Sequence, residues 1–389
     1  MIDTVLISAS SRASETIFGR PLLERLILMC ERAGMKRFFI ERPQGRGEQL
    51  RDALGSFRTS PNIELVDSLN QVLEQPFGMA REQPCLALSG NMVFARSQLN
   101  QMLAMQAEQP SRVIRVPSAG GDGTAVFATG PLGDLLSEIA TRTRNGTSSG
   151  YLPYVLDGRP EDGREAELRL ARSVRLETTD SDGLLARLFD RKISWRISYR
   201  LAYTPITPNQ VTLFNTGLGL LSAWMFSVPG YWIRLLGSLV FLLIVTIDGV
   251  DGELARLRMT ESEWGGKLDV ITDNIVHIVL FIGLMIGCYR ASGSAAYFYL
   301  LPLLLGGFVL SAISVNRAFK AGAAGEEWIK QVDRIAGRDF AYLLVVLAAI
   351  NQLEFFAWGT AFGTYVFAFG MWWFTNRHAR NAATASRSS

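Results

Sequence analysis

The stretch from Asp248 to Asp273 reads DGVDGELARLRMTESEWGGKLDVITD, and long apolar segments lie on both sides of it. Asp248 and Asp251 are three residues apart, and Asp269 and Asp273 are four apart, so each pair projects from one face of a helix. Ionisable side chains at membrane depth are costly, and they are tolerated where they are paired, hydrated or bound to a cation. The four carboxylates therefore predict a functional site where two neighbouring helices approach each other.

The chemistry of this site follows from its donor atoms. An all-oxygen cluster favours Mg²⁺ or Mn²⁺ over zinc, and four converging carboxylates predict a site with two ions. Two such ions grip a diphosphate and orient its attacking and departing oxygens, which predicts a nucleotide diphosphate substrate. Gly252 and Ala255 leave room for a ligand to approach the helix backbone, and Arg256 supplies a fixed pair of donors for phosphate.

Six apolar stretches follow residue 205, and a helix needs about 20 mainly apolar residues to cross a bilayer. The predicted spans are Val211–Val228, Tyr231–Val250, Leu268–Cys288, Ala296–Val315, Phe340–Asn351 with its flanks, and Phe355–Phe374. Lysine and arginine cluster on one side of these spans, which the positive-inside tendency makes cytoplasmic. We therefore expect an all-α six-helix transmembrane domain at 205–378 in the cytoplasmic membrane, with both termini in the cytoplasm and a disordered tail at 379–389.

Residues 1–180 have a different character, because short β-rich runs alternate with helical patterns. Thr4–Ser8 and Arg37–Glu41 are predicted strands, and the helix between them, at Pro21–Ala33, ends at Gly34. This alternation predicts an α/β doubly wound soluble domain whose parallel sheet is covered on both faces. The N-terminus has no basic segment followed by an apolar core, so we expect this domain to stay in the cytoplasm.

Composition argues against other classes of protein. A formal net charge of +3 is too small, and the basic residues are too dispersed, for a protein that binds nucleic acid. Cys30, Cys85 and Cys288 lie far apart without metal-binding spacing, so neither a zinc site nor a disulfide framework is indicated.

A segment with helical periodicity connects the two parts, at residues 181–204. Apolar residues recur there every fourth position: Leu185, Phe189, Ile193, Ile197 and Leu201. Arginines line roughly the opposite side. Such a helix before a membrane span lies among the lipid headgroups. The alternative is an ordinary helix packed on the first domain.

The complete pattern Asp248-x2-Asp251-Gly252-x2-Ala255-Arg256-x8-Gly265-x3-Asp269-x3-Asp273 resembles the signature of the CDP-alcohol phosphotransferase family. The resemblance implies that the aspartates hold metal ions, and that Asp273 is a ligand or the general base for the acceptor hydroxyl. It implies transfer of a phospho-alcohol from a CDP-alcohol donor to an alcohol acceptor, with release of CMP. It also implies a homodimer that works in contact with membrane lipid.

The chain also resembles this family in a second element, a Thr-Pro-Asn-x-x-Thr pattern at the start of the first predicted span. Its residues are Thr207, Pro208, Asn209 and Thr212. The nucleotide-binding residues implied by the resemblance are Asn209, Thr212, Gly252, Ala255, Arg256 and Gly265. Aspartate pairs also occur in intramembrane aspartyl proteases and in ion-coupled transporters. Neither of those classes explains the glycines and the arginine at these spacings.

Several basic residues are candidates for binding the acceptor. His277 lies one turn beyond Asp273 on the same face, as a metal ligand, a proton relay or a packing histidine. Arg317, Lys320, Arg334 and Arg338 either recognise a phosphate on the acceptor or anchor helices at the headgroups.

The first domain resembles sugar-phosphate nucleotidyltransferases, especially cytidylyltransferases, through the run Val5–Ile27, which includes Gly19–Arg25. The domain order resembles bifunctional inositol-phosphate cytidylyltransferase and di-inositol-phosphate-phosphate synthase proteins. However, the phosphate loop reads Ala9-Ser10-Ser11-Arg12 without glycine, and Asn91 stands where that family places a metal-binding aspartate. We therefore predict a degenerate domain. The alternatives are an active bifunctional enzyme and a membrane-anchored nucleotide-binding module without catalysis.

Overall fold

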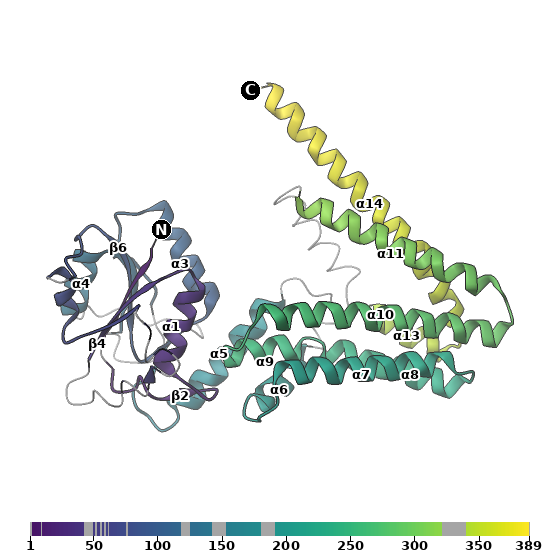
Figure 1. Ribbon diagram of the computed structural model, residues 1–389, viewed down its shortest axis with the longest axis horizontal. Helices are drawn as coiled ribbons and strands as arrows, with labels where there is room; N and C mark the ends of the chain where they lie inside the picture. Colours follow the sequence, from purple (N-terminus) through teal and green to yellow (C-terminus); the bar gives the residue numbers. More distant parts are fainter. Residues whose placement is uncertain are drawn as a thin grey trace. The chain divides into compact units, whose positions relative to one another are not determined.

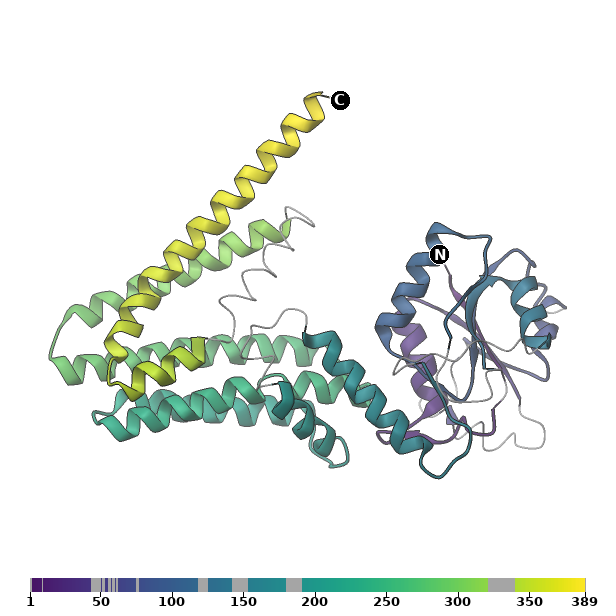
Figure 2. The same ribbon diagram turned by 180° about the vertical axis from the view of Figure 1, so that it is seen from behind.

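The structure, a computed structural model, describes residues 2–8, 10–42, 62–74, 77–117, 125–141, 153–179, 191–320 and 340–388, with isolated positions between 50 and 60. The chain divides into two compact units. The first comprises Met1–Glu177 with the short segment Arg256–Thr260, and the second comprises Thr178–Ala255 with Glu261–Ser389. Figures 1 and 2 show both units from opposite sides.

A six-stranded mixed sheet forms the centre of the first unit, in the order β5-β4-β1-β6-β9-β8 (Figure 1). Its strands are β1 (Thr4–Ser8), β4 (Arg37–Glu41), β5 (Ile63–Val66), β6 (Pro84–Ser89), β8 (Ile114–Arg115) and β9 (Phe127–Pro131). Strands β5, β4, β1 and β6 run parallel, whereas β9 is antiparallel to both β6 and β8. The prediction of a parallel sheet is therefore wrong at this edge. The connection between β8 and β9 is too short for a crossover helix, so these strands pair as antiparallel neighbours.

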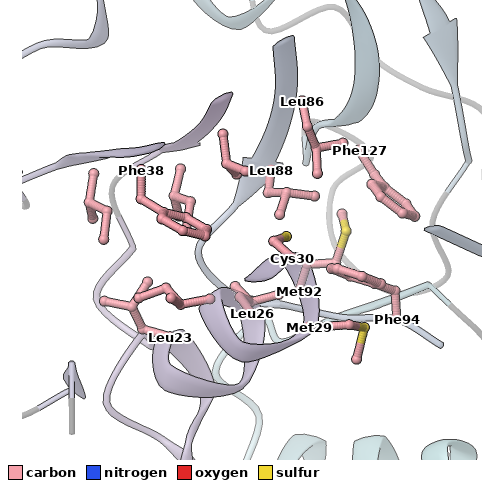
Figure 3. Packing of buried hydrophobic residues seen from close by; sticks show 14 of the residues in the cluster. Leu23, Leu26, Met29, Cys30, Phe38, Leu86, Leu88, Met92, Phe94 and Phe127 are labelled. Atoms are coloured by element: carbon pink, nitrogen blue, oxygen red, sulfur yellow. The ribbon is translucent and has the colours of Figure 1, made fainter. Parts of the chain in front are cut away.

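Helices cover both faces of this sheet, as the alternating pattern predicts. On one face α1 (Leu22–Arg32) and α3 (Arg96–Glu108) pack against alternate strand residues such as Val5 and Ile7. Figure 3 shows Leu26 of α1 facing this apolar layer. The opposite face, which includes Leu6, packs against α4 (Leu132–Thr141) and the short 3₁₀ helix η2 (Leu69–Leu73). Successive residues of a strand face opposite sides of the sheet, and consecutive residues of β1 are apolar, so both faces of the sheet are apolar.

Small elements complete the first unit: a hairpin of β2 (Thr16–Ile17) and β3 (Arg20–Pro21), a pair of β7 (Met92–Val93) and β10 (Tyr154–Val155), and α5 (Asp162–Thr179). The Asp162 carboxylate accepts hydrogen bonds from the Tyr154 hydroxyl and from the backbone N–H groups of Asp157, Gly158 and Arg159. Burial raises the pKa of Asp162, but these hydrogen bonds outweigh it and hold the pKa below its ordinary value.

The second unit is helical. Its helices are α6 (Arg191–Leu201), α7 (Pro208–Ser227), α8 (Tyr231–Ile247), α9 (Val250–Arg258), α10 (Glu263–Ser292), α11 (Ala296–Lys320), α13 (Phe340–Ala349) and α14 (Leu353–Ser388). The C-terminal end of α9 belongs to the segment grouped with the first unit. Helix α7 packs against α8 and α10, α13 packs against α8, and α11 packs against α14 (Figures 1 and 2).

Three helical stretches in the described residues are long and apolar enough to cross a membrane: Tyr231–Arg258, Glu263–Ser292 and Ala296–Ala318. They make a membrane protein the natural interpretation of this unit. Helices also occupy the positions of the other predicted spans, but α13 has only 10 residues, and α7 carries several polar residues and glycines. The prediction of six transmembrane helices is therefore supported only for these three.

Candidate active site

The start of α7 explains the Thr-Pro-Asn element in local terms. Thr207 is the N-cap, and its side chain accepts a hydrogen bond from the backbone N–H of Gln210 at 3.3 Å. The Gln210 side chain in turn accepts one from the Thr207 N–H at 2.9 Å, and Pro208 takes the first helical position. This capping box sets the beginning of α7 and so determines the face on which Asn209 and Thr212 lie.

The first aspartate pair lies where α8 gives way to α9. Asp248 is the C-cap of α8, and Gly249 separates it from Val250, the first residue of α9. Asp251 lies in the first turn of α9 and is only 8% exposed. The break in the helix therefore brings both carboxylates to one end of the apolar segment.

The second pair lies on the first half of α10. Ser262 caps this helix, accepting a hydrogen bond from the backbone N–H of Gly265 at 3.0 Å. A Cβ at Gly265 would lie 3.3 Å from Oδ1 of Asn209, so the glycine lets the beginnings of α7 and α10 approach closely. Asp269 and Asp273 follow one and two turns later.

Three of the four predicted metal ligands converge. Asp248, Asp269 and Asp273 each place a carboxylate oxygen so that all three lie within 4.8 Å of one another, and all three side chains are half-buried. Asp251 interacts with both Asp248 and Asp269, so it belongs to the same cluster. Its carboxylate accepts hydrogen bonds from the Thr212 hydroxyl and, at 2.6 Å, from the Gly252 N–H. The structure thus joins the two elements that the sequence analysis singled out separately.

Electrostatics make a cation the natural occupant of this cluster. Two like charges about 4 Å apart repel by roughly 4 kcal/mol at the effective dielectric constant near a protein surface. The donor set is entirely carboxylate oxygen, which fits Mg²⁺ or Mn²⁺ and does not resemble a zinc site.

The remaining nucleotide-binding candidates lie on the same helices. Asn209 is half-buried and Thr212 is buried against Asp251. Gly252 and Ala255 are half-buried positions of α9, and Arg256 follows on the same helix. Nε of Arg256 is buried and has no hydrogen-bond partner among the described residues. A guanidinium N–H in that state is suited to receive an anion.

Among the acceptor-binding candidates, the structure describes the side chains of His277 and Arg317. Nδ1 of His277 lies 2.7 Å from the backbone carbonyl oxygen of Asp273, and its ring packs near Phe241 and Phe340. Arg317 is exposed on α11, nothing is described of the Lys320 side chain, and Arg334 and Arg338 lie outside the described residues.

A buried carboxylate that the sequence analysis overlooked adjoins the signature. Glu253, only 1% exposed, accepts hydrogen bonds from the hydroxyls of Ser194 at 3.0 Å and Ser198 at 2.7 Å. Helix α6 therefore turns its small residues, not its aliphatic ones, toward the rest of this unit, and Ile193 is left 45% exposed. The signal was present as Ser194, Ser198 and Ala202, a stripe of small residues at helical spacing.

Comparison with known proteins agrees with this geometry. Residues 205–375 match the CDP-alcohol phosphatidyltransferase family, which confirms the resemblance seen in the aspartate signature. A bifunctional IPC transferase and DIPP synthase from Thermococcus kodakarensis is 32% identical over 225 residues, covering 56% of this chain and 49% of the relative. A protein of the same name from Aquifex aeolicus is 34% identical over 143 residues, covering 36% of this chain and 32% of the relative.

A third relative is named for lipid synthesis. The phosphatidylinositol phosphate synthase of Mycobacteroides abscessus is 30% identical over 105 residues, covering 26% of this chain and 46% of the relative. The chain thus spans about half or less of the length of these curated relatives. The aspartate cluster thus lies within residues 205–375, the part of the chain that matches the CDP-alcohol phosphatidyltransferase family.

Proposed function

We propose that this protein transfers a phospho-alcohol group from a CDP-alcohol to an acceptor alcohol and releases CMP. The observation that carries the proposal is the convergence of Asp248, Asp269 and Asp273 within 4.8 Å, inside the segment that matches the family. The acceptor oxygen attacks the phosphorus next to the donor alcohol. A new oxygen–phosphorus bond forms, the bond to the bridging oxygen breaks, and that oxygen leaves with CMP.

Different residues of this chain would hold the metal ions, accept the proton and contact the donor. Asp248, Asp251, Asp269 and Asp273 would hold one or two Mg²⁺ or Mn²⁺ ions, which when bound neutralise charge on the diphosphate. Asp273 accepts the proton of the acceptor hydroxyl. The other contacts proposed for the donor are Asn209, Thr212, Gly252, Ala255, Arg256 and Gly265. The Arg256 guanidinium, with its unpartnered buried Nε, supports this assignment because it can donate to a phosphate.

The reaction is tested by measuring CMP release from CDP-alcohols by the purified full chain. Asp269→Asn and Asp273→Asn should abolish release, and EDTA should abolish it in the unaltered protein. Glu261→Gln is the matched control, because it removes an exposed carboxylate between α9 and α10. CMP release that survives both EDTA and Asp273→Asn would refute the proposed mechanism.

The solubility of the product, in water or in organic solvent, identifies the class of substrate. Labelled CDP-diacylglycerol and labelled soluble CDP-polyols are compared with inositol phosphate, glycerol phosphate and lipid alcohols as acceptors. A water-soluble product supports polyol-phosphate synthesis, and a lipid product supports phospholipid synthesis. We place the domain in the cytoplasmic membrane as a homodimer, with both chain termini in the cytoplasm. Helix α6 supports the headgroup location, since Ile193 and Tyr203 are exposed beside its basic residues.

The first unit is proposed to be a degenerate nucleotidyltransferase-like domain. Nδ2 of Asn91 donates to the backbone carbonyl of Leu156 at 3.0 Å, so this side chain serves the local structure. Arg12, in the expected phosphate loop, forms an ion pair with Glu15. The full chain carrying Asp273→Asn should therefore consume no CTP in the presence of an alcohol phosphate. Turnover of CTP would favour a bifunctional enzyme, and CDP binding without CMP release in the unaltered chain would favour a binding module.

A further inference from the structure

Asn215 is a buried polar residue of α7 that the family signature does not include. Its side chain is 8% exposed, and its Oδ1 has no hydrogen-bond partner among the described residues. Buried polar atoms in proteins nearly always have a partner, so an exception of this kind points to an ion, a ligand or an ordered water.

The packing of α7 on α10 shows which residues of α10 lie level with Asn215, that is, at the same height along the helix axis. Gly265 lies beside Asn209, and Gly219 lies beside Val276, where a Cβ on the glycine would come within 2.6 Å of Val276 Cγ1. The two helices therefore run parallel, with residue numbers that increase in the same direction along both. Asn215 is four residues before Gly219, which puts it at the height of the residues three or four before Val276. Those residues are Thr272 and Asp273.

The same contacts give the direction in which Asn215 points. Thr212, Asn215 and Gly219 are spaced by three and four residues, so they share one face of α7. Thr212 on this face donates to Asp251, and Gly219 on this face contacts α10. Asn215 lies between them and is therefore directed toward the helices that carry the aspartates.

We propose that Asn215 is a positioning residue of the aspartate cluster, whose side-chain amide oxygen accepts a hydrogen bond from a water bound to the divalent ion. The inference rests on the proposed metal-dependent function. Mg²⁺ usually keeps several of its waters in protein sites, and residues that bind such outer ligands strongly affect metal affinity. An amide oxygen suits this role because it accepts hydrogen bonds without adding charge.

Binding of Mn²⁺ to the purified full chain tests this role without relying on activity. Free Mn²⁺ is followed by electron paramagnetic resonance during titration. Asn215→Leu, which keeps the side-chain size but removes the hydrogen bond, should weaken binding by about 10-fold. Ser222→Ala is the control, because Ser222 lies two turns further along α7 and has its own partner, the Gly237 carbonyl at 2.9 Å. This control should bind Mn²⁺ as tightly as the unaltered chain.

Asn215→Asp provides a second measurement, which does not depend on whether the leucine variant folds. Its carboxylate would face the cations, so Mn²⁺ should raise the melting temperature more in this variant than in the unaltered chain. Unchanged Mn²⁺ affinity in Asn215→Leu, or no additional Mn²⁺ stabilisation in Asn215→Asp, overturns the inference. If the unaltered chain binds no Mn²⁺, the proposed metal chemistry fails instead, so the two failures are distinguishable.

Discussion

A single methyl group on α7 should disturb the aspartate cluster from a distance. In Gly219→Ala the new Cβ would lie 2.6 Å from both Cγ1 and Cγ2 of Val276 and 3.2 Å from its Cβ. Carbon atoms in contact normally lie about 3.5–4.0 Å apart, so α7 and α10 must separate locally by about 1 Å. Overpacking of this kind lowers the free energy of unfolding by about 1–3 kcal/mol. A displacement of about 1 Å at the aspartates can reduce turnover by about 100-fold.

The assay pairs CMP release with thermal unfolding of the purified protein. Gly217→Ala is the control on the same helix, because a Cβ there meets nothing within 4 Å. It should leave turnover unchanged, and alanine should stabilise the helix by about 0.5–1 kcal/mol. Val276→Ala removes the two methyl groups that the new Cβ meets. The double variant of Gly219→Ala with Val276→Ala should therefore regain much of the lost turnover. Full activity in the single variant, or no recovery in the double variant, would refute the proposed coupling of helix packing to the site.

Three other predictions concern single contacts. Glu253→Ala removes the side-chain acceptor of the Ser194 hydroxyl, whereas the Ser198 hydroxyl keeps the Ser194 carbonyl as an acceptor. Unfolding should be easier by about 1–3 kcal/mol and limited proteolysis should cut at α6 sooner; an unchanged cleavage rate would contradict this. Thr212→Val removes a hydrogen bond to the aspartate cluster at nearly constant shape, and Mn²⁺ affinity should fall about 10–100-fold in the same titration. Asp162 has a depressed folded pKa, so its contribution is complete above the unfolded pKa of about 3.9 and is lost as the pH falls through the folded pKa. Asp162→Asn should thus lower stability at neutral pH and weaken its loss on acidification, as measured by thermal unfolding from pH 2 to 7.

The helical placement of the aspartates was predictable from local sequence. Asp248 and Asp251, like Asp269 and Asp273, share helix faces through spacing alone, and α8 and α10 are apolar enough to identify. The capping box at Thr207 is likewise a local pattern. The helix faces were predicted correctly, and the capping box could have been, because helix periodicity and capping depend on residues within one turn of each other.

Other features depend on which segments become neighbours. The antiparallel edge formed by β9 was missed, because short runs of β-forming residues look alike in either direction. The small-residue face of α6 was missed for a related reason. Its aliphatic stripe is the stronger hydrophobic signal, yet Ser194 and Ser198 face the buried carboxylate of Glu253.

By itself, the sequence determined that the four aspartates form two pairs, each on one face of a helix beside an apolar segment. Only the tertiary structure decided that Thr212 meets Asp251 and that Asn215 lies buried at the height of Asp273. The physical reason is that spacing along one helix sets a face, whereas the register between helices is set by side-chain contacts far apart in the chain. At α7 and α10 those contacts are made by glycines that admit close approach, and no local pattern reveals which residues they will meet.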